Sequence, residues 1–220
     1  VISVGRTVLG TLCTIIGSSF LGFMFTQEKL WRRKFWYRFT VATMYFSAGL
    51  IPWYILMVNL GLKNNFLLYI LPSAVGAYYV VLSKTYIESI PASVEESAKI
   101  DGAGVLTIYA RLILPMSMPI IACLIVFCAV NQWNAWSDNF YLVSDPKLST
   151  LQYQLYMNLA NESSNVTNTT SSSSLLRSKA TTELGLRYAL SMLTVLPIIL
   201  VYPFMQKYFV KGIMLGAVKG

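Results

Sequence analysis

The sequence predicts an all-α, polytopic membrane protein, and its composition and the length of its apolar stretches carry this prediction. Of its 220 residues, 55% are hydrophobic and 12% are charged, whereas about a quarter of the residues in an ordinary soluble domain are charged. The mean hydropathy is +0.57. Five stretches are long enough to cross a bilayer as helices, which takes about 20 largely apolar residues.

The predicted spans are distributed along the whole chain. They are residues 7–25, about 39–58, about 66–83, about 113–130 and about 187–206. The last contains Pro197 and Pro203. Prolines are tolerated in membrane helices when neighbouring helices satisfy the freed backbone groups, so we expect these spans to pack as a bundle.

Basic residues in the loops set the orientation, because loops rich in Lys and Arg stay on the cytoplasmic side. The loop after the first span carries Lys29, Arg32, Arg33, Lys34 and Arg38 against Glu28, whereas the next loop has Lys63 as its cation. Alternation then places 84–111 inside, 131–183 outside and the C-terminus inside. The same loops account for the net charge of +8 without a nucleic-acid partner. Five spans with an inner C-terminus put Val1 outside, so we expect a further N-terminal span before it.

The residue types present exclude several classes of site. The chain has no His and no Cys pair at metal-ligand spacing, so a zinc or haem site has no obvious ligands. Its cysteines, Cys13, Cys123 and Cys128, lie in apolar runs and are expected to be small buried hydrophobes. No Gly-Lys pair occurs, so the phosphate-binding loop of an ATPase is missing. We therefore predict no metal site and no catalytic residue.

A charged segment, "SIPASVEESAKIDGAG", interrupts the apolar sequence at residues 89–104. Its charged residues are Glu95, Glu96, Lys99 and Asp101. Ser93 is a possible N-cap, the acids complement the helix dipole, and Gly102 ends the helix. A second short helix is expected over 105–113, after which Leu114-Pro115 restarts the chain as a span. Such an acidic knob either docks into a groove on another protein or lies on the bilayer. We favour docking, because surface-lying segments usually carry Lys and Arg.

The run "IPASVEESAKIDGAGVLTIYARLILPMSMPIIA" (residues 90–122) resembles the EAA loop of binding-protein-dependent ABC importer permeases. Glu96-Ser97-Ala98 stand at the E-A-A positions, with Ser97 replacing one small residue by another. Asp101-Gly102-Ala103 stand at the D-G-A that is typical of sugar permeases, and Ile113-Leu114-Pro115 stand at the far end.

Two further segments are similar to the same subfamily, the maltose-type carbohydrate permeases and their complex-oligosaccharide branch. They are "NQWNAWSDNFYLVSDPKLSTLQ" (131–152) and the tail "QKYFVKGIMLGAVKG" (206–220). The resemblance implies one type I ABC importer transmembrane domain over residues 1–220. Within it, about 88–113 would be a cytoplasmic coupling loop, about 131–186 an external polar loop and about 206–220 a cytoplasmic tail.

The resemblance also implies roles and partners. The coupling loop would dock into the ATPase through Glu95, Glu96, Ser97, Ala98, Asp101, Gly102, Ala103, Leu114 and Pro115. The tail would contact the ATPase through Gln206, Lys207, Lys211, Gly212 and Lys219, although its lysines also suit positive-inside anchors. The partners would be a second, homologous permease chain, two ABC ATPase subunits that hold ATP and Mg, and a solute-binding protein. The location would be a bacterial cytoplasmic membrane, with lipid around the spans and no cofactor on this chain.

A cluster of amides and aromatic residues lies at the outer end of the fourth predicted span. The candidates for the substrate pathway are Asn131, Trp133, Asn134, Trp136 and Asp138, with Gln132 among them. Aromatic residues and amides suit sugars, which offer apolar ring faces and hydroxyl edges. We nevertheless favour an interfacial belt or packing over direct sugar contact for this cluster, because Trp and Tyr collect at membrane interfaces.

We predict that the chain is a permease subunit that imports a carbohydrate by alternating access, and that this carbohydrate is an oligosaccharide. One alternative is an importer permease for a solute other than a sugar. A membrane-embedded enzyme acting on lipid or cell-wall precursors would need titratable groups at membrane depth, which these spans hardly provide. A purely structural anchor would leave the acidic loop without a purpose.

Overall fold

The computed structural model describes residues 1–165, 185 and 188–200, and no strand occurs among them. The elements are α1 (Ile2–Met24), α2 (Arg33–Thr43), α3 (Leu50–Asn59), the 3₁₀ turns η1 (Phe66–Tyr69) and η2 (Leu71–Ser73), α4 (Ala77–Ile87), α5 (Ala92–Ile100), α6 (Val105–Ile108), the π-helical turn η3 (Tyr109–Ile113), α7 (Leu114–Met116), α8 (Met118–Asn134), α9 (Ser137–Leu142), the 3₁₀ turn η4 (Pro146–Leu148) and α10 (Leu151–Asn165). A further apolar helix covers Tyr188–Leu200. The predicted all-α fold is confirmed.

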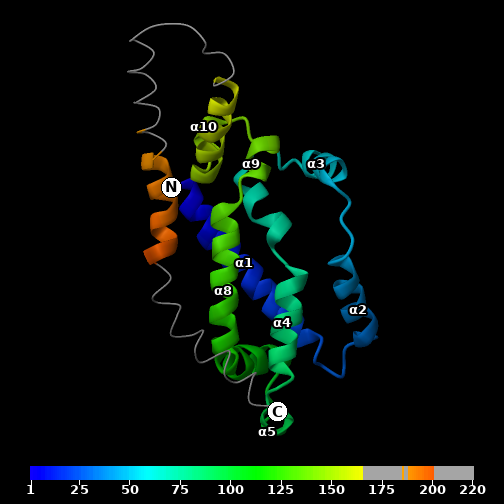
Figure 1. Ribbon diagram of the computed structural model, residues 1–220. Helices are drawn as coiled ribbons and strands as arrows, with labels where there is room; N and C mark the ends of the chain where they lie inside the picture. Colours follow the sequence, from blue (N-terminus) through cyan, green and yellow to red (C-terminus); the bar gives the residue numbers. More distant parts are fainter. Residues whose placement is uncertain (166–184, 186–187, 201–220) are drawn as a thin grey trace, which may run out of the picture.

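Helix α1 is the central element of the described chain. It packs against both α4 and α8 (Figure 1). Its 23 residues rise by about 1.5 Å each, which is enough to cross the hydrocarbon core of a bilayer of about 30 Å. Within the described residues it is the one unbroken helix that is long and apolar enough to span a membrane.

The polarity of α1 is inverted relative to a helix of a soluble protein. Large apolar side chains at every fourth position are exposed, namely Val4, Val8, Leu12 and Ile16. The buried face consists mostly of small and hydroxyl-bearing residues, including Gly10, Thr11, Thr14, Ser18, Ser19 and Gly22. Lipid is as apolar as leucine, so membrane helices associate through close backbone approach and hydrogen bonds rather than through hydrophobic burial. This pattern identifies the exposed stripe of α1 as a surface for lipid or a neighbouring helix.

Two glycines let the backbone of α4 and its preceding bend come close to α1. A Cβ atom on Gly17 would lie 2.7 Å from the carbonyl oxygen of Ala74, and one on Gly22 would lie 3.0 Å from Cβ of Ser83. The hydroxyl of Ser18 accepts a hydrogen bond from the backbone N–H of Gly76 at 3.0 Å. The two segments therefore touch almost backbone to backbone.

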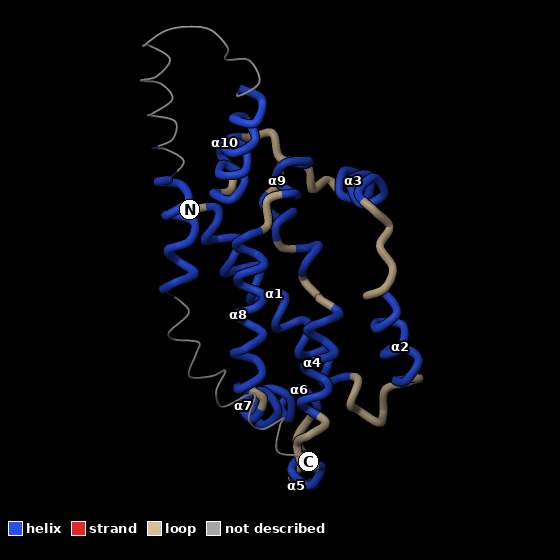
Figure 2. The backbone as a smooth tube through the Cα atoms, in the orientation of Figure 1, coloured by secondary structure: helices blue, strands red, loops and turns tan. Residues whose placement is uncertain are grey.

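Two predicted spans are bent in the structure. Residues 66–73 meet α4 at 45°, so the predicted span at about 66–83 is broken. The helical residues 105–116 meet α8 at 82°, which makes them an elbow across the lower end of α8 (Figure 2). The span predicted at about 113–130 is therefore not one straight helix, because the chain turns at Ser117 and α8 begins at Met118. Pro119 lies in the first turn of α8, where its missing N–H costs no helical hydrogen bond.

The predicted span at about 39–58 is not a single helix. Helix α2 ends at Thr43, and α3 begins at Leu50 directly after Gly49, whose φ of 83° interrupts any right-handed helix. Among the described residues, one helix, or up to three if each bent pair counts as one, is long and apolar enough to cross a membrane. The fifth predicted span is described as far as Tyr188–Leu200, and its remaining residues lie outside the described part of the chain.

The loops separate into two ends, in the alternation predicted from the charges. At one end, the ammonium group of Lys84 lies 4.3 Å from the ring centre of Tyr37, which joins α4 to the basic segment. At the other end, the backbone N–H of Asn64 donates to the carbonyl of Leu142 at 3.1 Å. Figure 1 shows α5 and α10 at these opposite ends. By the charge rule, the end with α5 is the inner end and the end with α10 is the outer end.

We predict that Gly22→Val weakens the packing of α1 on α4. The added side chain would meet backbone atoms of Val80 and Lys84, both 3.1 Å from a Cβ at this position, so we expect a loss of about 1–3 kcal/mol. The measurement is the thermal unfolding midpoint of the purified protein in detergent. Cys13→Val is the control, because Cys13 is exposed on the same helix, unlike Cys123 and Cys128 and contrary to the expectation that it is buried. Equal midpoints for the two variants would contradict this interface.

Candidate functional site

The acidic segment, predicted to belong to a coupling loop, forms helix α5, which lies below the ends of α1 and α4 (Figure 1). The helix begins at Ala92, directly after Pro91, and has no side-chain cap. The predicted N-cap at Ser93 is therefore wrong, because the proline starts the helix two residues before it and places Ser93 within the first turn. The carbonyl of Ser93 instead accepts a hydrogen bond from the hydroxyl of Ser97 at 2.8 Å.

Helix α5 ends in a Schellman motif centred on Gly102. The N–H of Gly102 donates to the carbonyl of Lys99 at 3.1 Å, and the N–H of Ala103 donates to the carbonyl of Ala98 at 3.0 Å. The φ of Gly102 is +75°, a left-handed conformation in which glycine carries no Cβ penalty. The turn predicted at this position is thus fixed by two hydrogen bonds and one glycine.

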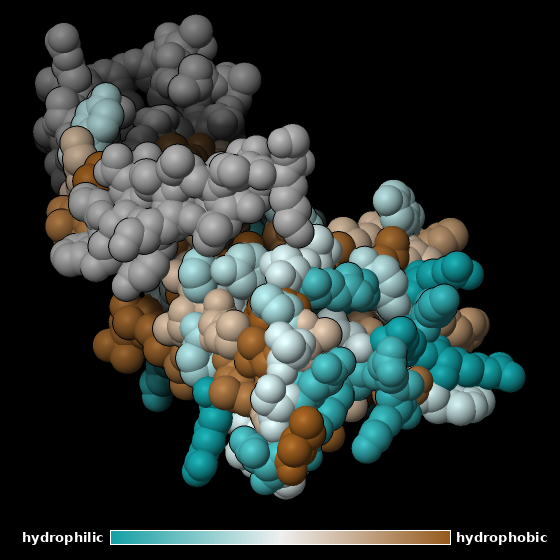
Figure 3. Space-filling view, turned by 90° about the horizontal axis from the view of Figure 1, so that it is seen from below, coloured by the Kyte–Doolittle hydropathy of each residue, from teal (hydrophilic) through white to brown (hydrophobic). Residues whose placement is uncertain are grey.

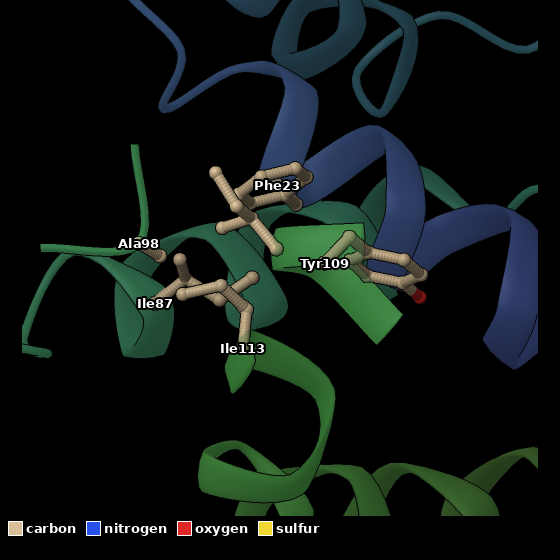
Figure 4. Packing of buried hydrophobic residues seen from close by; sticks show 6 residues of the cluster. Phe23, Ile87, Ala98, Tyr109 and Ile113 are labelled. Carbon is tan, nitrogen blue, oxygen red and sulfur yellow. The ribbon is translucent and has the colours of Figure 1, made fainter. Parts of the chain in front are cut away.

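One face of α5 is anchored in a buried cluster. Ala98 is 8% exposed and packs with Phe23, Ile87, Ile108, Tyr109 and Ile113, as Figure 4 shows for five of these residues. We call this group the anchor cluster. Ala103 and Leu114 pack against its edge. Because its members come from α1, α4, α5 and the elbow, the cluster joins α5 to the inner ends of two membrane helices.

The acidic side chains of α5 are divided between two roles. Glu95 forms an ion pair with Lys99 at 2.7 Å, one helical turn away. Glu96 and Asp101 are exposed, and the side chain of neither forms an ion pair or hydrogen bond with a residue that the structure describes. Ser97 and Pro115 are exposed as well. Figure 3 looks onto this end of the molecule, where hydrophilic side chains gather over the described surface.

The elbow after α5 is tied to α1 by Tyr109. Its hydroxyl lies 2.7 Å from the hydroxyl of Ser19, and its ring meets the ring of Phe20 edge-on at 5.2 Å. Tyr109 begins the π-helical turn that precedes Pro115. π-Helical turns are rare and are often found at functional sites.

Arg6, which the sequence analysis did not single out, organises the outer end. It is 4% exposed. Its guanidinium group binds both carboxylate oxygens of Asp138, at 3.0 and 2.5 Å, and its Nε donates to Oε1 of Gln132 at 3.3 Å. The sequence did contain a signal for this site: Arg6 is a lone cation at the edge of the first apolar stretch, and a cation at that depth needs an acidic partner.

The Arg6–Asp138 pair belongs to a larger packed network. The guanidinium lies 4.7 Å from the ring centre of Tyr69. The hydroxyl of Tyr69 donates to the carbonyl of Leu148 at 2.8 Å and accepts from the side-chain amide of Asn139 at 2.5 Å. These contacts hold α1, η1 and α9 together.

The two predicted tryptophans also make packing contacts. The indole N–H of Trp133 donates to the carbonyl of Thr194 at 2.9 Å, and the ring of Trp136 stacks on the ring of Tyr156 at 3.8 Å. Both contacts agree with packing, the interpretation favoured for this cluster. Asn134 is exposed.

A polar cavity of about 360 Å³ lies between α1, the bend before α4, and α8. Polar side chains that line it are Arg6, Thr14, Ser73, Tyr79, Asn131 and Gln132. The amide of Asn131 donates to the hydroxyl of Tyr79 at 3.1 Å, and the amide of Gln132 donates to the hydroxyl of Ser73 at 2.7 Å. Of the six predicted pathway residues, Asn131 and Gln132 lie in this wall. Its amides, hydroxyls and tyrosine ring match the chemistry of a sugar.

A second hollow shows the contrast. It measures about 120 Å³, lies beside the helix Tyr188–Leu200, and is lined mainly by apolar groups, including Val126, Trp133 and Pro197. Such a wall offers little to a ligand that is rich in hydroxyl groups. The predicted tail residues Gln206, Lys207, Lys211, Gly212 and Lys219 lie outside the described residues.

Comparison with known proteins shows which family the chain matches and which proteins it is similar to. Residues 15–215 match the family described as binding-protein-dependent transport system inner membrane component. The polygalacturonan/rhamnogalacturonan transport system permease protein YtcP of Bacillus subtilis is 34% identical over 219 residues, covering 100% of this chain and 76% of the relative. Protein LplC of the same organism is 31% identical, covering 100% of this chain and 73% of the relative.

A solved structure is similar as well. It is the crystal structure of a bacterial ABC transporter involved in the import of the acidic polysaccharide alginate, with a TM-score of 0.78 and 26% sequence identity. The match covers 94% of this chain and 74% of the other.

We predict that Asp138→Leu destabilises the protein by about 3–5 kcal/mol, because it leaves the buried Arg6 charge without its partner. The double variant Arg6→Met/Asp138→Leu removes both charges, and we expect it to recover most of that loss. The measurement is the unfolding midpoint in detergent of the parent, Arg6→Met, Asp138→Leu and the double variant, which together form a double-mutant cycle. Additive losses, with no recovery in the double variant, would show that the two side chains do not act as a pair.

Proposed function

The chain belongs to the family of binding-protein-dependent transport system inner membrane components, and we propose that it imports an oligosaccharide of an acidic polysaccharide through coupling at α5. It is a permease subunit of an ABC importer, and ATP hydrolysis lies in a separate subunit. The observation that carries the coupling proposal is the combination of exposed acids and a buried anchor on one short helix.

Helix α5 has the properties that a docking helix needs. Its exposed Glu96 is available for a charge-assisted hydrogen bond in a groove of a partner ATPase. Its Ala98 face is fixed in the anchor cluster, and Gly102 closes the turn. A force on α5 therefore reaches Phe23 of α1 and Ile87 of α4 without an intervening flexible segment.

Alternating access follows from this connection. Packed interfaces switch between discrete arrangements instead of deforming continuously, so a displacement of α5 moves the inner ends of α1 and α4 as bodies. The elbow, which meets α8 at 82°, also connects α8 to the anchor cluster. Closure of a partner ATPase pair would thereby change the access to the polar cavity at the other end.

The family places the chain in the bacterial inner membrane as part of an importer with other subunits. We propose that these subunits are a second, homologous permease chain, two ABC ATPases and a solute-binding protein. The ATPases would hold ATP and Mg, and the C-terminus would lie in the cytoplasm. The absence of a Gly-Lys pair from the sequence supports a separate ATPase.

The substrate class rests on relatives and on the cavity. Among the similar proteins, YtcP is named for polygalacturonan/rhamnogalacturonan and the solved transporter for the acidic polysaccharide alginate, while others are named for arabinooligosaccharides and for melibiose, raffinose and stachyose. The cavity offers neutral amides, hydroxyls and the ring of Tyr79, which suit hydroxyl edges and sugar faces. An oligosaccharide of acidic sugars is therefore the proposed cargo, ahead of a solute that is not a sugar.

We predict that Glu96→Lys releases the ATPase from the importer, because a lysine in place of the exposed acid reverses the charge at the docking surface. The measurement is mass spectrometry of the subunits that co-purify with the tagged protein from its native membrane. Glu28→Lys is the control, since it makes the same reversal on the same side of the membrane, on a side chain that is 90% exposed and outside the coupling loop. If the same amount of ATPase co-purified with Glu96→Lys as with the parent, or if the parent purified without partners, the coupling proposal would be overturned.

We predict that Asn131→Leu lowers the uptake of oligogalacturonide by about fivefold, the equivalent of one lost hydrogen bond of about 1 kcal/mol. Asn134→Leu is the control, because Asn134 is exposed and outside the cavity wall. The measurement is uptake into proteoliposomes that contain the complete importer, at equal protein content. If the parent transported neutral oligosaccharides in preference to oligogalacturonide, the acidic substrate class would be overturned. Equal uptake by the Asn131→Leu and Asn134→Leu variants would overturn the assignment of the cavity as the binding site.

A further inference from the structure

A hollow with a basic wall lies at the inner end, apart from the coupling loop. It measures about 250 Å³ and brings together the end of α1, the first turns of α2, and α4. Its cations are Arg33, Lys34, Arg38 and Lys84. The other lining groups are Phe25, Tyr37 and one acid, Glu88. We call it the basic hollow.

The positive charge of the basic hollow is only partly compensated. Glu88 pairs with Lys84 at 2.6 Å, and Lys84 also lies over the ring of Tyr37. Glu28 approaches Arg33 no closer than 4.0 Å. Within the described part of the chain, the side chains of Lys34 and Arg38 form no hydrogen bond and no ion pair. The hollow therefore has one neutralised wall and two cations available for an anion.

The depth of the hollow matches that of the lipid headgroups. The apolar helix α1 ends at Met24, and the next residue, Phe25, lines the hollow. Large aromatic side chains around α2 are exposed, namely Trp31, Phe35, Trp36 and Phe39. Aromatic side chains are enriched at the membrane–water interface, and the cytoplasmic leaflet of a membrane carries the anionic lipids.

We propose that the basic hollow binds the phosphate headgroup of an anionic phospholipid from the inner leaflet. Lys34 and Arg38 hold the phosphate, while Lys84, fixed by Glu88 and Tyr37, closes the wall on the α4 side. Orientation by the positive-inside rule needs cations in the loop but does not need them to converge with α1 and α4 on one hollow. The exposed aromatic residues of α2 supply the surface on which the acyl chains lie, which a free phosphate would not use.

A bound lipid would connect α2 with α4 close to the anchor cluster. Lys84 precedes Ile87, a member of that cluster, by one turn of the same helix. Lipid in the hollow would therefore brace the helix that carries α5.

The test uses the complete importer, purified and stripped with delipidating detergent, with bound phospholipid counted by native mass spectrometry. The variant is Lys34→Gln/Arg38→Gln. The control is Lys63→Gln/Lys147→Gln, which removes two exposed cations at the outer end. We expect the parent and the control to keep anionic phospholipid, and the variant to bind phosphatidylglycerol at least roughly tenfold more weakly, because each basic residue near the surface adds to the attraction.

A second measurement distinguishes the sources of phosphate and does not depend on the variant. Phosphatidylglycerol should raise the unfolding midpoint of the parent after exhaustive delipidation has removed its bound lipid, whereas phosphatidylcholine and inorganic phosphate should not. Conservative Lys34→Arg/Arg38→Lys should keep the lipid. Equal retention by the parent and Lys34→Gln/Arg38→Gln would overturn the site, and stabilisation by inorganic phosphate alone would overturn the lipid as its occupant.

Discussion

The close approach of α1 to its two neighbours is the constraint on which the rest of the structure depends. In a bilayer, burial against another helix gains little over burial in lipid, so association requires short backbone distances and satisfied polar groups. Helix α1 supplies both, because glycines face α4 while Thr14 donates to the carbonyl of Ser73 at 2.5 Å and Ser18 accepts from Gly76. The bend before α4 is held by these same bonds. A larger side chain on this face would displace the bend, and with it the wall of the polar cavity.

The same helix connects the two ends of the molecule. Phe23, near its inner end, belongs to the anchor cluster with Ala98, and Arg6, near its outer end, binds Asp138 and Gln132. Close-packed interiors transmit strain instead of absorbing it. A movement imposed at α5 must therefore shift α1 or break the anchor cluster. Because α1 packs against both α4 and α8, and all three helices line the polar cavity, a shift of α1 would also move the cavity wall.

The class of protein and the short helix α5 with its closing turn could be predicted from the sequence, because composition and local motif determine them. Gly102 could be placed in the turn because a left-handed residue at a helix end is usually glycine. The bends could not be predicted, since hydropathy averaged over about 20 residues passes over a single Gly49 or Ser117. Arg6 could not be assigned a partner, because Asp138 lies more than a hundred residues away in the chain. A cluster of amides and aromatic residues reads the same in sequence whether its members face a ligand or one another.

The Arg6–Asp138 pair limits how this subunit reads its cargo. Separating a buried, bidentate pair to offer Arg6 to an acidic sugar would leave Asp138 unpaired, at a cost of about 3–5 kcal/mol. One new ion pair with a substrate carboxylate would do no more than replace the one that was broken. The groups that can exchange partners cheaply are neutral: Asn131 and Tyr79 are joined by one hydrogen bond, and Asn131 is exposed. Contacts in the proposed binding cavity would therefore recognise hydroxyls and ring faces, and the charge of the proposed acidic oligosaccharide would have to be recognised elsewhere in the importer.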